Sequence, residues 1–470
     1  MDRNITEHVN PGVLPLIKTL WQDHNLPAEA LEHLTVTGPR AALASSFSVS
    51  NAAQASIAAA ATMASVIAHH RTGHYKSISV DSTEAAMECT GLFKLNGETP
   101  PQFAPLSGLY KTNDGYIRLH ANFDHHRDII LDTLGLPVGT GTSRHQTEST
   151  ISQWKTDDLD TAITNAGGAC ATFRTFEQWD KHPQAIELAQ LPLIEITKIG
   201  DGDPRPLNAI NESGLPLSHL RILDLTRILA GPVCGRTLAA YGADVMLVNS
   251  PDLPNIDSIA ETSRGKLSAH IDLQSAEGIK ILHSLIAQSH VFIQGYRPGA
   301  ITERGFGAEE LAKKYPGIVC TSLSAFGRNG PWSNRRGFDS LTQTATGFNA
   351  AEAIAYDSNT PKAMPVQILD YASGFLMAFG TQMALYKQAK DGGSYHVQVS
   401  LARTGLWLRQ MGHSASSLNV EAANPEDYLE AYESGFGALE AIPHAARFKP
   451  PSTQWRLPSV PPGTHPPQWT

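Results

Sequence analysis

The second half of the chain alternates short apolar runs with longer amphipathic segments. Five apolar runs have the length and composition of buried strands, at 221–225, 244–248, 291–294, 317–322 and 395–399. Amphipathic stretches with helical spacing lie between and after them, at 232–240, 275–288, 308–315, 371–389 and 400–409. Such alternation predicts a parallel sheet with helices on both faces. We therefore expect an α/β fold with a doubly wound, Rossmann-like sheet domain.

The first half has a different texture. An Ala- and Ser-rich helical stretch at 41–68 is followed by a strand pattern at 76–80. From residue 108, Asn113-Asp114-Gly115 predicts a hairpin turn, and helical patterns follow. We divide the chain into four parts: a partial, helical copy of the sheet domain, a smaller α+β domain, the complete sheet domain and a C-terminal tail, at 1–99, 100–210, 215–415 and 416–470.

Two segments carry few regular patterns. The stretch 200–217 is rich in Gly, Pro and Asn and predicts a linker. Residues 441–470 contain 8 of the 30 prolines. Because proline lacks a backbone N–H and fixes φ, we expect that tail to lack regular structure and to run over the surface as extended chain.

The chain also contains an internal repeat. Residues 50–75 align with 370–395 without a gap, and both end in a Gly-x-Tyr sequence that precedes a strand. Six positions are identical, at Ala52, Ala58, Met63, Ala64, Gly73 and Tyr75 of the first segment. Together with the shared order of helix and strand, these identities favour a duplication.

Composition and charge exclude several classes of protein. Hydrophobic residues make up 41% and charged residues 17%, which allows a large core and excludes general disorder. The net charge of -9 argues against a nucleic-acid binder. No apolar run approaches the ~18 residues of a membrane span, and the polar first residues do not resemble a signal or transit peptide. We expect a cytoplasmic protein.

Metal and thiol chemistry have little support. The four cysteines form no Cys-x-x-Cys pair, so neither a zinc ribbon nor a disulfide framework is expected. His120, His125 and His126 have poor spacing for one metal, because neighbouring helical side chains point about 100° apart. We expect no metal site.

Asp370 is the carboxylate most open to a chemical role. It follows Val366-Gln-Ile-Leu369 and precedes a long helix. A carboxylate there can act as a nucleophile on an activated acyl group, and the helix N-terminus would stabilise its charge. Aspartate is also a favoured helix N-cap, which is the simpler interpretation of the position alone.

Basic residues beside Gly or Pro favour a ligand with several phosphates. They occur in Arg264-Gly-Lys266, in Tyr296-Arg-Pro-Gly299 and in Arg335-Arg-Gly-Phe-Asp339. A Gly-Pro turn also joins the strand at 221–225 to its helix, where ligands bind in open α/β sheets. The chain has neither a dinucleotide-binding Gly-x-Gly-x-x-Gly there nor a Gly-x-Ser-x-Gly nucleophile elbow.

These motifs together resemble CoA-transferase family III, the CaiB–BaiF family. The matching sequences are Leu-Asp-Leu-Thr-Arg with a following Ala-Gly-Pro; Gly-Ala-Asp-Val; Gly-Lys with a following Ile-Asp-Leu; Tyr-Arg-Pro-Gly; a Gly-Pro turn; Gly-Phe-Asp; and an Asp before a long helix. They lie in order at 222–232, 242–245, 265–273, 296–299, 324–331, 337–339 and 370. Residues 100–200 resemble the smaller domain of that family.

The resemblance implies a mechanism and a set of site residues. Asp370 would attack an acyl-CoA thioester, form an aspartyl mixed anhydride and then an aspartyl-CoA thioester, and pass CoA to a carboxylic acid. Coenzyme A would be a substrate, with no permanently bound cofactor. The positions that match the CoA-binding residues of the family are Arg227, Ile228, Leu229, Ala230, Lys266, Ile271, Tyr296, Arg297 and Arg336. Family members form interlocked dimers, so the resemblance also implies a homodimer.

Two departures from the family pattern keep alternatives open. The chain begins with a fragment that resembles the end of the sheet domain, and Ser50 there takes the place of Asp370. We expect a tandem duplication with one active site per chain. The racemase branch of the family carries His where this chain has Phe338, which disfavours an acyl-CoA racemase or isomerase. That racemase remains the alternative, and a non-catalytic CoA-binding relic is the second alternative.

Overall fold

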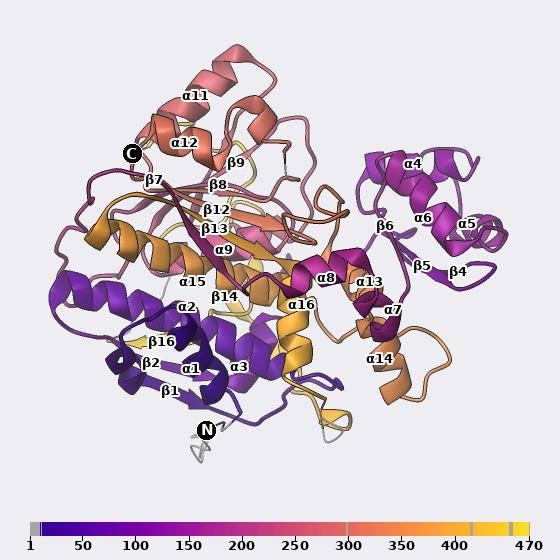
Figure 1. Ribbon diagram of the computed structural model, residues 1–470, viewed down its shortest axis with the longest axis horizontal. Coiled ribbons are helices and arrows are strands. Elements are labelled where there is room, and N and C mark those ends of the chain that lie inside the picture. Colours follow the sequence, from indigo (N-terminus) through magenta and orange to yellow (C-terminus); the bar gives the residue numbers. More distant parts are fainter. Residues whose placement is uncertain (1–9, 11, 298, 414–416, 451–454, 470) are drawn as a thin grey trace.

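A seven-stranded, mostly parallel sheet forms the centre of the protein, as the computed structural model shows (Figure 1). The model describes all residues except 1–9, 11, 298, 414–416, 451–454 and 470. The sheet runs in the order β10 (Lys266–His270), β9 (Asp244–Asn249), β8 (Arg221–Leu225), β11 (Val291–Gln294), β12 (Val319–Ser324), β13 (Ser394–Ser400) and β7 (Glu195–Gly200). Neighbouring strands are parallel except β7, which is antiparallel to β13.

Helices cover both faces of this sheet, which confirms the doubly wound α/β fold. On one face lie α9 (Ala230–Ala240), α15 (Ile368–Asp391) and α16 (Leu401–Gln410). On the other lie α11 (Ala276–Ala287) and α12 (Ala308–Lys314). Two separate apolar cores result: Ile222 of β8 belongs to the first and Leu223 to the second, as alternation along a strand requires.

A glycine allows α9 and α15 to approach closely. A Cβ at Gly374 would lie 2.5 Å from the carbonyl oxygen of Ala230, which is far inside van der Waals contact. Short helices complete the region, namely α10 (Ile259–Thr262), η2 (Thr302–Arg304), α13 (Asp339–Ala345) and α14 (Phe348–Ala355). The close crossing matters because the N-termini of α9 and α15 both border the candidate site.

The smaller α+β unit has its own core. It comprises β4 (Gly108–Lys111), β5 (Tyr116–Leu119), α4 (Asp124–Thr133), α5 (Arg144–Ile151), α6 (Thr156–Asn165) and β6 (Cys170–Thr172). Its core includes Leu119, Ile130 and Leu159. The predicted hairpin at Asn113–Gly115 is confirmed by the antiparallel pairing of β4 with β5. Helices α7 (Phe176–Asp180) and α8 (Pro183–Ala189) then lead back to β7.

The N-terminal segment shares the main core. It comprises α1 (Leu14–Asp23), η1 (Ala28–His33), β1 (Leu34–Thr37), α2 (Val49–Thr72), β2 (Ser77–Asp81), α3 (Ser82–Glu88) and β3 (Phe93–Leu95). Helices α2 and α15 lie side by side, and each has 24 residues (Figure 1). Near their middles, the side-chain amide of Gln382 donates a 3.0 Å hydrogen bond to the carbonyl of Ala60.

One arrangement of three strands and a helix occurs twice. In the main sheet β12 is parallel to β13, β13 is antiparallel to β7, and α15 lies between β12 and β13 in the chain. In a smaller sheet β1 is parallel to β2, β2 is antiparallel to β16 (Ala446–Lys449), and α2 lies between β1 and β2. The equivalence of α2 and α15 is the one that the sequence repeat predicts.

The prediction that 441–470 lacks regular structure is wrong over β16. Pro443 and Pro450 lie on either side of β16, and the strand itself contains no proline. Every residue of the strand therefore keeps the backbone N–H that sheet pairing needs. The strand joins the small sheet, while η4 (Pro425–Tyr428) precedes β14 (Glu430–Tyr432), which pairs with β15 (Leu439–Ala441), and β15 pairs with β3. The tail is therefore partly built into the core. Residues 451–454 and 470 of the predicted tail lie outside the described residues.

Helix α2 is long and apolar enough to cross a membrane by length and composition. The sequence expectation that no stretch reaches that length is therefore corrected. Within the protein, 94% of its apolar window is buried, largely against α15 and the small sheet. Core helices of globular proteins pass the same test when they are buried on every side.

Candidate active site

Asp370 lies inside the first turn of α15. The N-cap of this helix is Gln367, so Asp370 is the third helical residue and the N-cap interpretation is wrong. The residue is 7% exposed and lines a cavity of about 450 Å³. We call this space the aspartate cavity. A carboxylate in the first turn is stabilised by the helix dipole when it is ionised.

A second carboxylate lies directly beside Asp370. The backbone N–H of Asp370 donates a 2.9 Å hydrogen bond to Oδ2 of Asp339, the first residue of α13. Oδ1 of Asp339 accepts a 2.6 Å hydrogen bond from Gln343. Burial raises the pKa of Asp339 to about 6. Burial and then the charge of Asp339 hold the pKa of Asp370 well above its ordinary value. Strongly raised carboxyl pKa values in a cavity are typical of functional sites.

The described walls of the aspartate cavity contain no Lys or Arg. They combine apolar side chains with small neutral polar ones, and Asp257 is the third acidic residue beside Asp339 and Asp370. Seven stretches of the described chain contribute to them, at 90–93, 99–105, 120–122, 228–229, 255–258, 338–340 and 367–371. The first two stretches lie before β4 of the smaller unit and are far in sequence from Asp370.

A second cavity of about 310 Å³ is cationic. It is lined by Arg227, Arg297, Arg335 and Arg336, and its described walls contain no Asp or Glu. We call it the arginine cavity. Arg335 is already paired with Asp160 of α6 at 2.6 Å. Burial, and then the neighbouring charge of Arg297, lowers the pKa of Arg336, as expected where cations gather without an anion.

The arginine cavity also presents buried polar atoms without a partner. Nε of Arg227 and Nδ1 of His126 have no hydrogen-bond partner among the described residues. The Arg227 guanidinium lies 5.2 Å from the centroid of the Phe123 ring and donates a hydrogen bond to the carbonyl of Pro254. Tyr296 lines the same cavity. Pro298 of the Tyr-Arg-Pro-Gly motif lies outside the described residues.

Ile228 and Phe338 border both cavities. Ile228 follows β8 and has a φ of +76°, which is uncommon for a β-branched residue. Backbone strain of this kind is concentrated at functional sites. Leu229 borders the aspartate cavity only. The two cavities are therefore neighbouring parts of one site, joined at the loop that leads into α9.

A histidine side chain packs against Phe338, one of the two residues that border both cavities. The ring of His120 stacks on Phe338, with centroids 3.6 Å apart, and His120 also lines the aspartate cavity. Burial and then the charge of His126 lower the pKa of His120 to about 3. His120 is therefore neutral at physiological pH. Its spacing from His125 gave no metal signal, and the stacking on Phe338 was not apparent from the sequence.

Three of the predicted CoA-binding residues do not reach either cavity. Lys266 is completely buried, and its Nζ is 2.9 Å from Oδ2 of Asp224 and 2.8 Å from the carbonyl of Pro232. Ile271 packs in the second core, and Ala230 is buried at the start of α9. The assignment of these three residues to a ligand is therefore corrected: the strand position of Lys266 directs it to a structural ion pair under α9.

The matching position of the first copy, Ser50, is buried at the start of α2. Ser50 is 1% exposed, and its Oγ accepts a 3.0 Å hydrogen bond from the backbone N–H of Ala42. It does not line the aspartate cavity or the arginine cavity. The Ser50 hydroxyl thus stabilises the loop before α2. Of the two matching positions, only the one in α15 carries a carboxylate, that of Asp370.

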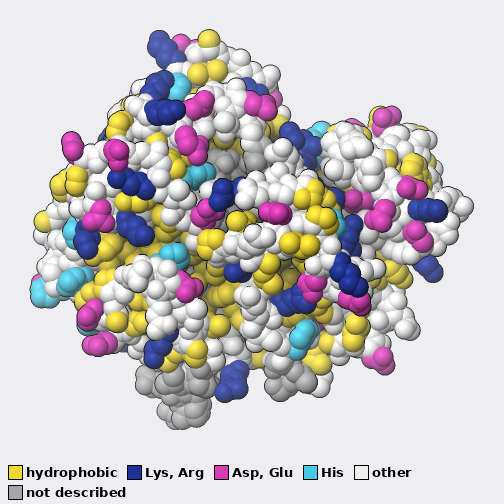
Figure 2. Space-filling view, viewed as in Figure 1, with side chains coloured by type: hydrophobic (Ala, Val, Ile, Leu, Met, Phe, Trp, Pro, Cys, Tyr) yellow, Lys and Arg dark blue, Asp and Glu magenta, His cyan; other side chains and the backbone are white. Residues whose placement is uncertain are grey.

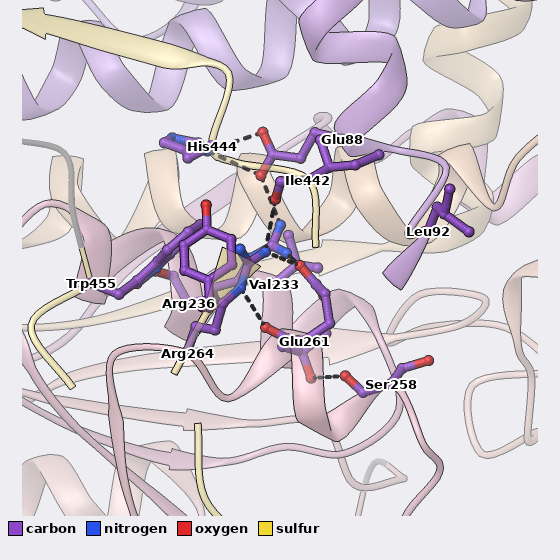
Figure 3. A network of polar contacts seen from close by, with 12 residues as sticks. Glu88, Leu92, Val233, Arg236, Ser258, Glu261, Arg264, Ile442, His444 and Trp455 are labelled. Carbon is purple, nitrogen blue, oxygen red and sulfur yellow. Dashed lines mark hydrogen bonds and ion pairs between the residues drawn. The ribbon is translucent and has the colours of Figure 1, made fainter. Parts of the chain in front are cut away.

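A buried ionic network lies close in sequence to two stretches that line the aspartate cavity, 90–93 and 255–258 (Figure 3). Glu88 of α3 accepts a 2.8 Å hydrogen bond from Arg236 of α9 and lies 3.0 Å from Nδ1 of His444. Arg236 also pairs with Glu261, which pairs with Arg264 at 2.6 Å. Figure 3 shows these side chains pointing toward one another from separate segments of the chain.

This network fixes walls of the cavity. The backbone N–H of Glu261 donates a 3.1 Å hydrogen bond to the carbonyl of Ser258, a lining residue. Burial opposes ionisation of Glu88, but His444 and Arg236 more than offset it and lower the pKa of Glu88 to about 2. Arg264, a phosphate-binding candidate in the sequence analysis, is 1% exposed, and its guanidinium carbon lies 4.0 Å from the centroid of the Trp455 ring.

The face that Figure 2 shows carries charged side chains of both signs. Lys and Arg side chains there are interspersed with Asp and Glu and form no continuous basic patch. Nucleic-acid binding faces are typically basic over a wide area. The cations that gather without anions line the arginine cavity instead.

Comparison with known proteins identifies related sequences. The family model described as CoA-transferase family III matches residues 28–200 and 217–428. Acetyl-coenzyme A transferase nodX of Hypoxylon pulicicidum is 28% identical over 65% of this chain and 55% of its own length. Succinyl-CoA–D-citramalate CoA-transferase of Chloroflexus aurantiacus is 29% identical over 40% of this chain and 49% of its own. The chain thus spans about half the length of these curated relatives.

A solved structure of a CAIB/BAIF family protein from Brucella suis is 25% identical to the chain. The match covers 48% of this chain and 65% of that one, with a TM-score of 0.37.

Proposed function

The chain belongs to CoA-transferase family III, and from this premise we propose that it transfers coenzyme A from an acyl-CoA thioester to a carboxylic acid, with Asp370 as the nucleophile. One observation carries the proposal: a cationic cavity and a cation-free cavity meet at Ile228 and Phe338, and Asp370 lies in the second. Coenzyme A is a chain with phosphates at one end and a thioester at the other. The cationic cavity matches the phosphate end of coenzyme A, and the cation-free cavity matches its thioester end.

The arginine cavity would hold the phosphates. Arg227, Arg297 and Arg336 present guanidinium groups, which bind phosphate oxygens with paired hydrogen bonds. The unpartnered Nε of Arg227 supports this role, because a buried donor is costly without an acceptor. The pantetheine arm would pass Ile228 and Phe338, so that the thioester reaches Asp370.

The first half-reaction exchanges the acyl group and CoA on Asp370. The ionised Asp370 attacks the thioester carbonyl, a C–O bond forms, the C–S bond breaks, and the CoA thiolate leaves. The thiolate then attacks the aspartyl carbonyl of the mixed anhydride. An aspartyl-CoA thioester forms, and the donor acid leaves as a carboxylate that carries one oxygen from Asp370.

The second half-reaction runs the same steps with the acceptor. Its carboxylate attacks the aspartyl-CoA carbonyl, releases the thiolate and forms a new anhydride. The thiolate attacks the acceptor's acyl carbonyl, and the product acyl-CoA leaves. Asp370 is restored as a carboxylate that retains one oxygen of the acceptor. No proton is consumed in either half, so the site needs no general acid.

Asp339 would position Asp370 without contacting the reacting atoms. Its hydrogen bond to the backbone N–H fixes the first turn of α15, and its charge disfavours ionisation of Asp370. A carboxylate of raised pKa is a stronger nucleophile once ionised. In the anhydride and in the thioester Asp370 is uncharged, so its repulsion with Asp339 is relieved as the covalent intermediate forms.

Racemase activity is the less favoured function. Phe338 has no group that transfers a proton, and His120 behind it has a pKa of about 3, which makes it a weak base for an α-proton. The matched relatives described above carry transferase names. A non-catalytic CoA-binding relic would retain the arginine cavity without chemistry at Asp370.

Trapping of the intermediate tests the proposal. The protein is incubated with a panel of acyl-CoA thioesters and quenched with hydroxylamine, and peptides are analysed by mass spectrometry. We expect a hydroxamate at Asp370 that is absent from Asp370→Asn. CoA binding without any adduct would overturn the proposal; α-proton exchange in deuterated water would then indicate a racemase, and no exchange would indicate a relic.

A further inference from the structure

We propose that the aspartate cavity selects uncharged, apolar acyl groups and that Phe103 enforces this choice by covering Arg118. The inference rests on the proposed function and specifies its substrate class. It concerns the acyl part of the thioester, whereas the arginine cavity concerns its phosphates.

The composition of the walls favours an apolar acyl group. The apolar lining residues are contributed by several separate segments and include Leu92, Phe93, Phe103, Leu229, Ile256 and Tyr371. The charged lining residues among those described are acidic, namely Asp257, Asp339 and Asp370. A second carboxylate on the acyl group would enter this space beside like charges and without a cation, which is unfavourable in a partly dehydrated site.

One cation lies just behind the wall. Arg118 of β5 is 8% exposed, and its guanidinium carbon lies 5.6 Å from the centroid of the Phe103 ring. Phe103 lines the aspartate cavity and Arg118 does not. His120, which follows the end of β5 two residues after Arg118, lines the cavity.

Arg118 has few electrostatic partners to hold its charge. The structure gives it the cation–π contact with Phe103 and the attraction of Asp339. A guanidinium so placed is able to bind a carboxylate if the ring between it and the cavity is removed. Phe103 therefore acts as a specificity-determining residue: it supplies apolar surface to the cavity and excludes the cation from it.

The selectivity of the unmodified protein is the first test. Octanoyl-CoA, phenylacetyl-CoA, succinyl-CoA and glutaryl-CoA are each incubated with the full chain, quenched with hydroxylamine, and scored for hydroxamate at Asp370. We expect the first two to label Asp370 at least about 10-fold faster than the two dicarboxylic thioesters, because a buried unpaired carboxylate is costly. Equal or faster labelling by succinyl-CoA or glutaryl-CoA would overturn the inference and leave the proposed function intact.

Variants test the role of Phe103. Phe103→Ala should raise labelling by succinyl-CoA about 10-fold or more, because a hydrogen-bonded ion pair with Arg118 becomes possible. The matched control Leu92→Ala also enlarges the cavity but leaves Phe103 over Arg118, so it should not raise that labelling. The double variant Phe103→Ala with Arg118→Met should lose the gain.

A conservative variant keeps the test open if Phe103→Ala folds poorly. Phe103→Leu retains an apolar cover and should preserve the preference for octanoyl-CoA, with folding checked by CoA binding. A gain for succinyl-CoA that persists without Arg118 would contradict the role of the covered cation. Labelling by none of the four thioesters, with CoA still bound, would instead overturn the proposed function together with this inference.

Discussion

The backbone N–H of Asp370 donates a 2.9 Å hydrogen bond to the side chain of Asp339. Two carboxyl groups are thereby held together at the starts of α13 and α15, and both are buried. The contact has two consequences that oppose each other. It orients the first turn that carries Asp370, and it places a like charge beside the group that must ionise to react.

The pH dependence of acyl transfer to Asp370 should report this relationship. Asp370 attacks as a carboxylate, and its pKa is raised by burial and then by Asp339. The rate of hydroxamate formation should therefore rise with pH, with a midpoint well above the ordinary aspartate value of 3.8. Asp339→Asn removes the like charge and should move that midpoint to lower pH.

Rapid-quench labelling at a series of pH values measures this shift. Asp252→Asn is the matched control, because it changes an exposed aspartate outside both cavities. An unchanged midpoint in Asp339→Asn would show that Asp339 acts through structure alone.

Stability should also depend on Asp370, with a definite sign. Its folded-state pKa is raised, so ionisation costs folding free energy as pH rises above the unfolded-state value, and the full cost is present above the folded-state pKa. Asp370→Asn should therefore raise the thermal midpoint at pH 8.5 and raise it less at pH 5. Thermal unfolding of both proteins at the two pH values checks this. An equal gain at both would contradict the raised pKa.

Loss of the Glu88 carboxylate should strongly destabilise the protein. Glu88→Gln removes one of the two carboxylates that pair with the buried Arg236, the other being Glu261, and breaking a buried pair costs about 3–5 kcal/mol. In Glu84→Gln, the matched control from the same helix, the lost partner is the partly exposed Arg447, and the cost should be about 1 kcal/mol or less. Urea unfolding distinguishes the two, and similar losses would contradict the role of the network.

The same network predicts acid sensitivity. The pKa of Glu88 is lowered to about 2, so its contribution is fully present above the unfolded-state pKa and is lost as pH falls from about 4.5 to about 2. In unfolding curves across this range, the wild type should lose more stability than Glu88→Gln. Parallel losses in the two proteins would show that other carboxylates dominate.

Arg336 should contribute to CoA binding through charge. Arg336→Ala should weaken binding by about 1.5–3 kcal/mol, the range for hydrogen bonds to charged groups. The effect should shrink in high salt, because screening weakens charge interactions. Arg409→Ala removes an equal charge from an exposed pair with Asp180 and should leave CoA affinity unchanged. Isothermal titration with CoA measures both, and equal affinities in the two variants would contradict a phosphate role for Arg336.

The sequence predicts most of the sheet because its signals are local. Five of the six parallel strands are apolar runs between helices, whereas β10, with the sequence Lys-Leu-Ser-Ala-His, has no such signal. The repeat of 50–75 at 370–395 correctly predicts two equivalent helices. Asp370 was identified by its motif, and Asp339 was part of the Gly-Phe-Asp sequence without an assigned role. What the sequence could not give is the pairing of their carboxyl groups, since the two residues belong to different helices.

The errors have physical causes. Lys266 looks available beside Gly265, but it begins the edge strand β10 and its side chain is buried under α9, where Asp224 of β8 neutralises it. The tail was expected to be irregular, yet a short stretch free of proline completes the small sheet. Glu88 is 148 residues from Arg236 and 356 from His444, so only the folded chain shows their network. Self-association remains a prediction.

The fate of the acceptor's oxygen atoms tests the central claim most directly. The acyl-CoA that labels Asp370 best is mixed with its own free acid labelled with ¹⁸O at both carboxylate oxygens, in unlabelled water. After several turnovers, the peptide containing Asp370 is analysed by mass spectrometry. The proposed anhydride route leaves one acceptor oxygen on Asp370, so ¹⁸O should appear at that residue. Exchange of CoA into the free acid with no ¹⁸O at Asp370 would contradict it.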